Sequence, residues 1–236
     1  MEARATEVAW PEEPVVYREP DHWRAIRTSG WLTGLFRRQF EKKTLNATPE
    51  RILNVLKSSR IRCVLIGVVG MAGWRSQPRA SGDVDILVAR SNFSKAVSRL
   101  RGEFRLLRVT RDKGKATFDW RGRFGWDSII DVFKPSDRLL REAYSDPIVL
   151  PNGVRIARLE VALATKYRNA TNATREWGDK YQDAADLGDS FRQSEPYVDM
   201  GILRKLADVV RPNGGLRLVR FLNHLKKKTG RIKLPS

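Results

Sequence analysis

The feature that most constrains the fold of this chain is a change in hydrophobic periodicity at Leu159. From Ile61 up to that point, short apolar runs alternate with turns containing glycine, proline or aspartate, which is typical of strands. After it, apolar residues recur every three or four positions, which predicts helices. Strands gathered in one part of a chain and helices in another favour the α+β class. We therefore expect a mixed β-sheet with flanking helices, followed by a C-terminal helical bundle.

The expected elements follow from local patterns and are named by residue range. The predicted strands are 61–66, 83–88, 104–110, 115–120 and 128–133, with a hairpin of 148–150 and 154–157. The predicted helices are a broken amphipathic helix at 21–43, a helix at 48–57, one capped by Ser91, and 159–170, 176–191, 201–210 and 216–228. Residues 1–20 lack a clear period and are interpreted as an arm or loop.

The charge of the chain is strongly unbalanced. It contains 45 Lys and Arg against 27 Asp and Glu, a formal net charge of +18. The excess lies mainly in 90–126 and 201–236, whereas 1–45 is nearly balanced. Basic side chains that neutralise phosphates release counterions, so this clustering favours a polyanionic partner such as nucleic acid. The alternative is a generally basic character that serves solubility.

Other composition features exclude several classes of protein. Cys63 is the only cysteine, so no internal disulfide can form, and His22 and His224 do not have the spacing of a zinc site. The N-terminus is acidic without an apolar signal core, and no apolar run approaches the ~20 residues of a membrane span. We expect a cytoplasmic protein that does not cross a membrane.

Two carboxylates define the candidate reaction centre. Asp83 and Asp85 open a predicted strand, and the two-residue period of a strand places both on one face. Like charges so close together are unfavourable unless a cation lies between them. Carboxylate oxygens suit Mg²⁺, or Mn²⁺ in its place. A third acid on a neighbouring strand would complete the site, and the pattern favours Asp131 over the alternative Asp119.

Groups able to contact phosphate surround these acids. A glycine turn at Gly67 precedes them, and Arg79 and Ser81 come immediately before them. Backbone amides of turns and helix starts bind phosphate readily. An exposed strand with two incidental acids is the alternative, and the tripeptide alone favours that alternative.

A second charged group lies in the helical half. Asp179, Asp183 and Asp186 recur at i, i+4 and i+7 and share one helix face. Such acids need cations opposite them, and Lys166 and Arg168 on the preceding helix could supply these. A solvated acidic face with incidental basic residues is equally consistent with the periodicity.

Together these motifs resemble a known family. Gly67, Arg79, Ser81, Asp83, Asp85 and Asp131 resemble the core of the nucleotidyltransferase superfamily, and the segments 159–166 and 180–187 resemble motifs of its abortive-infection, toxin-type members from type IV toxin–antitoxin systems. The resemblance covers about 48–192. It divides the chain into an N-terminal arm and amphipathic helix (1–45), a catalytic core (46–157) and a C-terminal helical region (158–236).

The resemblance implies transfer of NMP from an NTP to an acceptor hydroxyl, which the charge suggests is tRNA or another RNA. The roles it implies are catalysis by Asp83, Asp85, Lys166 and Asp183, metal binding by Asp83, Asp85 and Asp131, and nucleotide binding by Gly67, Arg79, Ser81 and Lys166. It also implies a cognate antitoxin protein as a partner. Val68 stands where the family has Gly or Ser, so an inert nucleotide- or RNA-binding module is the alternative function.

Overall fold

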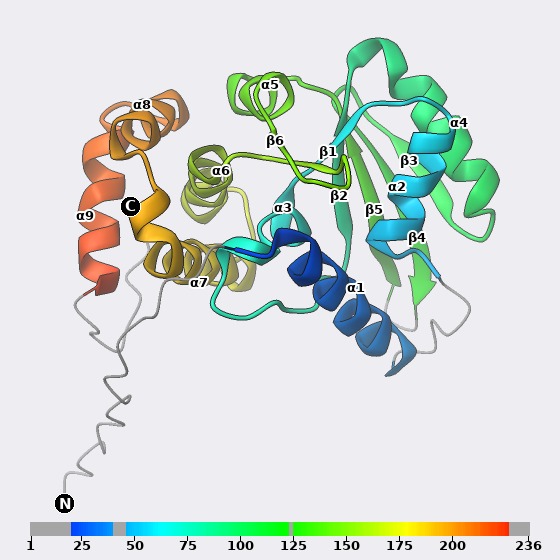
Figure 1. Ribbon diagram of the computed structural model, residues 1–236, viewed down its shortest axis with the longest axis horizontal. Helices are drawn as coiled ribbons and strands as arrows, with labels where there is room; N and C mark the ends of the chain where they lie inside the picture. The colour runs from blue at the N-terminus through cyan, green and yellow to red at the C-terminus, as the bar shows by residue number, and fades with distance from the viewer. Residues whose placement is uncertain (1–19, 40–45, 123–124, 227–236) are drawn as a thin grey trace, which may run out of the picture.

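The computed structural model describes residues 20–39, 46–122 and 125–226 (Figure 1). The helices are α1 (His22–Gln39), α2 (Pro49–Ser58), α3 (Gly67–Gly70), α4 (Phe93–Glu103), α5 (Arg138–Ser145), α6 (Leu159–Thr171), α7 (Trp177–Ser194), α8 (Met200–Val210) and α9 (Gly214–Lys226). Single 3₁₀ turns are η1 (Ala72–Trp74), η2 (Arg90–Asn92) and η3 (Glu195–Tyr197). The strands are β1 (Cys63–Leu65), β2 (Val84–Val88), β3 (Arg108–Arg111), β4 (Lys115–Gly122), β5 (Gly125–Phe133), β6 (Ile148–Val149) and β7 (Arg155–Ile156).

The strands form a single mixed sheet in the order β3-β4-β5-β2-β1-β7-β6. The pairs β2–β5 and β1–β7 are parallel, and the other neighbours are antiparallel. Long connections along the chain therefore bring β2 and β5 side by side at the centre of the sheet. The expected α+β class, with a mixed sheet followed by a helical region, is confirmed.

Alternation along the central strands decides which side chains reach each face of the sheet. In β2, Ile86 and its alternate neighbours belong to one hydrophobic cluster, while Leu87 belongs to the other. In β5, Ile130 and Val132 are fully buried in the first cluster. Because side chains alternate between faces, Asp131 lies on the second face, as Leu87 does.

Helices cover both faces of the sheet (Figure 1). Residues of α1, α2 and α4 pack in the first hydrophobic cluster, and residues of α5 to α9 pack in the second. The second cluster also contains Val64 of β1 and Leu87 of β2, so this cluster lies against the second face of the sheet. The division of the chain into three parts stays a prediction.

The starts of α2 and α4 differ in how well the local sequence predicts them. Thr48 caps α2, because its side chain accepts a hydrogen bond from the Arg51 amide, and Pro49 occupies the first turn. The prediction that Ser91 caps the next helix was wrong. A 3₁₀ turn precedes α4, and Asn92 occupies the cap position without a side-chain cap bond.

Some boundaries also differ from expectation. The N-terminal helix is continuous over its described length rather than broken. The arm predicted at 1–20 lies outside the described residues except for Pro20, as do the ends of the first and last predicted helices beyond Gln39 and Lys226. Within the described part of the chain, no helix has the length and apolarity needed to span a membrane.

Candidate functional site

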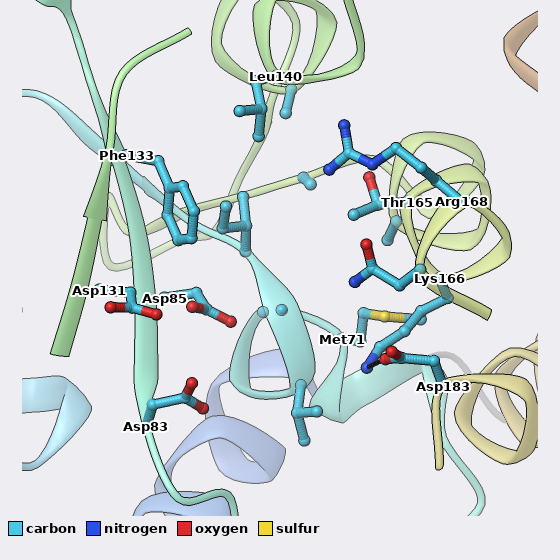
Figure 2. A pocket seen from close by; sticks show the side chains of 18 of the residues that line it. Met71, Asp83, Asp85, Asp131, Phe133, Leu140, Thr165, Lys166, Arg168 and Asp183 are labelled. Carbon is cyan, nitrogen blue, oxygen red and sulfur yellow. Dashed lines mark hydrogen bonds and ion pairs between the residues drawn. The ribbon is translucent and has the colours of Figure 1, made fainter. Parts of the chain in front are cut away.

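A pocket of about 870 Å³ opens between the second face of the sheet and the helices α6 and α7. Figure 2 shows the carboxylates of the strands on one wall and Lys166 with Asp183 on the opposite wall. The structure brings all of the predicted site residues to the lining of this pocket, namely Gly67, Arg79, Ser81, Asp83, Asp85, Asp131, Lys166 and Asp183. Their roles in binding or catalysis stay predictions.

Three carboxylates form an acidic triad on the sheet wall of the pocket. Asp83 immediately precedes β2, and Asp85 is the parallel register partner of Asp131 in β5. One oxygen from each of the three residues lies within 4.8 Å of the others. This separation suits a divalent cation with hard oxygen ligands. The geometry therefore fits a metal centre built from two adjacent strands.

The environment of Asp131 differs from that of its two neighbours. Lys115 Nζ lies 3.0 Å from Oδ2 of Asp131, and Ser128 Oγ lies 3.1 Å from Oδ1. Both contacts fix the orientation of the Asp131 carboxylate within the triad. The alternative third acid, Asp119, lies away from the triad and pairs with Arg108 at 3.1 Å. The choice of Asp131 over Asp119 as the third acid agrees with this geometry.

Asp83 and Asp85 carry unbalanced negative charge. Burial raises the pKa of Asp83, and the charge of Asp131 raises it further. Burial, followed by the charges of Asp83 and Asp131, raises the pKa of Asp85 well above its ordinary range. Ser81 donates a hydrogen bond to Asp83, whereas no described residue donates one to the Asp85 carboxylate. A bound cation would neutralise this excess of negative charge.

Gly67 makes room for the Asp85 carboxylate. Its φ of +64° lies in the left-handed region that glycine tolerates best. A Cβ at this position would lie 2.9 Å from Cγ of Asp85 and closer still to its Oδ2. The turn therefore needs glycine for its backbone conformation and for the approach of Asp85.

Substituting this glycine tests the triad geometry. We expect Gly67→Ala to displace Asp85 and to weaken Mn²⁺ binding by about tenfold, the lower end of the effect of losing a supporting contact at a metal site. Calorimetric titration with Mn²⁺ measures this effect. The matched control is Gly102→Ala in α4, because it lies outside the pocket lining, no atom lies within 4 Å of a Cβ there, and its φ is not positive. Equal Mn²⁺ affinity in the two variants would contradict the prediction.

The helical wall of the pocket presents a fixed cation. Lys166 on α6 is buried, and its Nζ lies 2.7 Å from Oδ1 of Asp183 and 2.7 Å from Oδ2 of Asp186. An ammonium group has three N–H donors, so these two carboxylates engage two of them. Arg175 also pairs with Asp183, with Nε 2.8 Å from Oδ2. The carboxylates hold the lysine head group in place.

Asp186 connects this wall to the segment that precedes the triad. It is 0% exposed, and Arg79 binds it through Nε at 3.1 Å and Nη2 at 2.8 Å. Arg75 forms a further ion pair with it. Burial alone would raise the pKa of Asp186, but the hydrogen bond from Arg79 and the charges of Lys166, Arg75 and Arg79 lower it well below its ordinary range. Arg79, predicted to bind nucleotide, thus also anchors the chain to α7.

The sequence interpretation singled out some of these groups and missed others. The helical period places Asp186 on the same face as Asp183 but gives it no role, and its position opposite Lys166 is the signal that indicates one. Lys115 was placed in a strand, yet its contact with Asp131 depends on the β4–β5 register. The other suggested cation, Arg168, pairs with Asp137 at 3.0 Å instead.

Comparisons with known proteins found similar solved structures but no matching sequence family. No protein-family model and no curated protein sequence matches the chain. Similar solved structures include an antigenic nucleotidyltransferase-like protein from Paracoccidioides brasiliensis, with 14% identity and a TM-score of 0.44, covering 89% of this chain and 94% of that one. JHP933 from Helicobacter pylori has 13% identity and a TM-score of 0.44, covering 77% and 96%. ANT(2")-Ia in complex with adenylyl-2"-tobramycin has 12% identity and a TM-score of 0.47, covering 69% and 94%. Similarities at this level carry no argument about activity, which has to come from the site.

Proposed function

We propose that this protein is a nucleotidyltransferase that moves NMP from an NTP to an acceptor hydroxyl with the help of Mg²⁺ or Mn²⁺. The observation that carries the proposal is the acidic triad, in which oxygens of Asp83, Asp85 and Asp131 lie within 4.8 Å of one another at the wall of a pocket. A divalent cation bound there would neutralise triphosphate oxygens and activate the attacking hydroxyl.

The residues around the triad have separate tasks in this proposal. Ser81 holds Asp83, while Lys115 and Ser128 hold Asp131 in its orientation toward the triad. The hydroxyl oxygen bonds to the α-phosphorus while its proton passes to water. The bond between the α-phosphorus and the bridging oxygen breaks, and pyrophosphate leaves with that electron pair. Positioning and charge neutralisation account for most of the catalysis in such transfers.

Lys166 is proposed to contact the triphosphate from the opposite wall. Asp183 and Asp186 engage two of its three donors, and no other described residue forms a hydrogen bond or ion pair with its ammonium group. The third donor is therefore available to a phosphate oxygen within the pocket. In this arrangement Asp183 orients Lys166 and does not take part in the bond changes.

An RNA such as tRNA is proposed as the acceptor. The lining of the pocket itself contains more aspartates than basic residues, so a polyanion would find its cationic contacts outside it. Arg111 and Lys113 are exposed beside Asp112 and Gly114, which line the pocket, and neither has an ion-pair partner among the described residues. An RNA end could thus approach over the turn between β3 and β4, with its backbone contacting these cations.

The toxin-like role and a cognate antitoxin protein are further parts of this proposal, supported by the resemblance of 159–166 and 180–187 to toxin-type motifs. The second candidate is an inert nucleotide- or RNA-binding module. It is favoured by Val68, whose branched side chain lines the pocket beside Gly67. Only the first candidate predicts release of pyrophosphate.

A transfer assay separates the two candidates. We expect the full chain, incubated with each labelled NTP, Mg²⁺ and total RNA, to release pyrophosphate and to label RNA, because the triad and Lys166 face one another across the pocket. Chelation of the metal should stop both signals. RNA binding, measured by filter retention, should weaken steeply as salt rises. Salt-sensitive RNA binding without pyrophosphate release under any of the four NTPs would support the inert module.

A further inference from the structure

The buried face of α1 is polar where it passes the triad. After Ile26, the inward positions Ser29, Thr33 and Arg37 follow at intervals of three or four residues and are all buried. Apolar side chains normally occupy such a stripe. Buried polar groups need hydrogen-bond partners, so the contacts of these three residues show what the stripe does.

Two successive turns of α1 form hydrogen bonds with the segment 79–82, which precedes Asp83. Ser29 Oγ donates to the Arg79 carbonyl at 2.6 Å. Thr33 Oγ1 accepts a hydrogen bond from the Ser81 amide at 3.0 Å. The helix therefore supports the backbone at Arg79 and Ser81, shortly before the first carboxylate of the triad.

Arg37 extends this support to the second strand. Its Nη2 donates to the Gly82 carbonyl at 3.0 Å and to the Ile129 carbonyl at 3.3 Å, and its Nη1 donates to the Ala47 carbonyl at 2.8 Å. Gly82 is bonded to Asp83, and Ile129 lies two residues before Asp131. One guanidinium thus joins the chain segments that carry the acids of β2 and β5.

We propose that Arg37 is a positioning residue for the acidic triad, holding the start of β2 and the middle of β5 at the spacing that brings the three carboxylates together. The inference rests on the proposed metal-dependent function, and it assigns a role to the N-terminal helix. The planar fork of arginine suits this task, because it directs several donors at fixed angles in one plane.

The cost of burying Arg37 supports this assignment. The side chain is 3% exposed, and its guanidinium contacts carbonyl oxygens and no carboxylate of the described residues. Burial lowers its pKa to about 10, although the charge of Asp83 acts in the opposite direction. An apolar side chain of similar size would avoid this desolvation but would leave the carbonyls of Ala47, Gly82 and Ile129 without their donor. Gly82 and Ile129 lie within two residues of acids of the triad, so the buried arginine acts where the triad is held.

Two substitutions of Arg37 and one control test the inference on the full chain. Arg37→Met removes the donors, Arg37→Lys keeps the charge without the fork, and Arg27→Met changes an exposed arginine of the same helix whose nearest acid, Glu50, is 3.9 Å away. At a temperature where all variants are folded by circular dichroism, Mn²⁺ affinity is measured by calorimetry. We expect a loss of about 10–100-fold for Arg37→Met, the range found when supporting contacts of metal ligands are removed. Arg37→Lys should be intermediate, and Arg27→Met should match the wild type.

Hydrogen–deuterium exchange supplies a readout that needs no metal. Arg37→Met should speed exchange at 82–86 and 129–131 more than at 93–103, because only the first two segments depend on the guanidinium. A lower melting temperature with unchanged Mn²⁺ affinity and evenly faster exchange would show a merely structural role and overturn the inference. If the wild type itself bound no Mn²⁺, the proposed function would fail, and the exchange pattern alone would decide whether Arg37 holds the two strands.

Discussion

Asp85→Asn is expected to reduce nucleotide transfer by about 10²–10³-fold or more, because it removes a charged group from the centre of the acidic triad. The amide keeps nearly the same shape, so the pocket should retain its form while it loses its affinity for the cation. Pyrophosphate release and Mn²⁺ titration of the same preparation measure the two effects. Transfer at the wild-type rate by Asp85→Asn would remove the triad from the mechanism.

The same substitution should stabilise the metal-free protein. The Asp85 pKa is raised in the folded state, so the folded protein binds this proton more tightly than the unfolded chain does. The charged carboxylate therefore costs stability above the raised pKa, and that cost disappears as the pH falls through it. We expect Asp85→Asn to gain roughly 1–2 kcal/mol at neutral pH, as other substitutions that relieve a strained site do. This gain should shrink toward acidic pH.

Asp119→Asn is the matched control for both effects. Asp119 is also a buried strand aspartate, but it pairs with Arg108 and lies outside the triad. Its substitution should leave transfer unchanged and lower the melting temperature, because it breaks a hydrogen-bonded ion pair. Opposite signs of the stability change at Asp85 and Asp119 would show that the triad is unbalanced in charge. A melting temperature lowered by both substitutions would contradict this.

Local patterns predicted the parts of the fold that depend on neighbouring residues. The Thr48 cap and Pro49 start of α2 are satisfied within one turn, and the alternation around Asp85 is a property of a single strand. Placing Asp131 beside Asp85 needed more than one strand, since their pairing joins parallel strands far apart in the chain. An isolated acid in an apolar strand only favoured Asp131 over Asp119, because the pairing of β2 with β5 is not visible in either strand alone.

Contacts between residues far apart in the chain could not be predicted from local sequence patterns. Arg37 reaches Gly82 and Ile129, which are 45 and 92 residues away along the chain. Its position in a predicted amphipathic helix gave no sign that it would be buried. Likewise, nothing near Arg79 in the sequence indicates that its guanidinium pairs with a helix residue 107 positions later. These contacts depend on how α1 and α7 pack beside the segment 75–82, which single-element patterns do not determine.

Asp186→Ala is expected to lower the free energy of unfolding by about 3–5 kcal/mol, the usual effect of removing one partner from a buried ion pair. Arg75, Arg79 and Lys166 would all lose an acceptor, and Arg79 has no other carboxylate partner among the described residues. Urea unfolding followed by circular dichroism measures the change. Asp189→Ala is the control, since this more exposed residue forms one ion pair among the described residues, with Arg75 at 3.4 Å, and accepts a hydrogen bond from the exposed Ser76 at 2.6 Å. Its loss should cost about 1 kcal/mol.

The pH dependence identifies the origin of the Asp186 effect. Its pKa is lowered in the folded state, so its ion pairs contribute fully above the ordinary pKa of an aspartate, and the contribution is lost as the pH falls toward the lowered value. The difference in stability between wild type and Asp186→Ala should therefore be constant near neutral pH and shrink in acid. A difference that stayed the same in acid would indicate lost packing instead of lost charge pairing. In that case the ion pairs of Asp186 with Lys166 and Arg79 would contribute little to stability. Asp186 would then not be needed to connect α7 to the segment that precedes the triad.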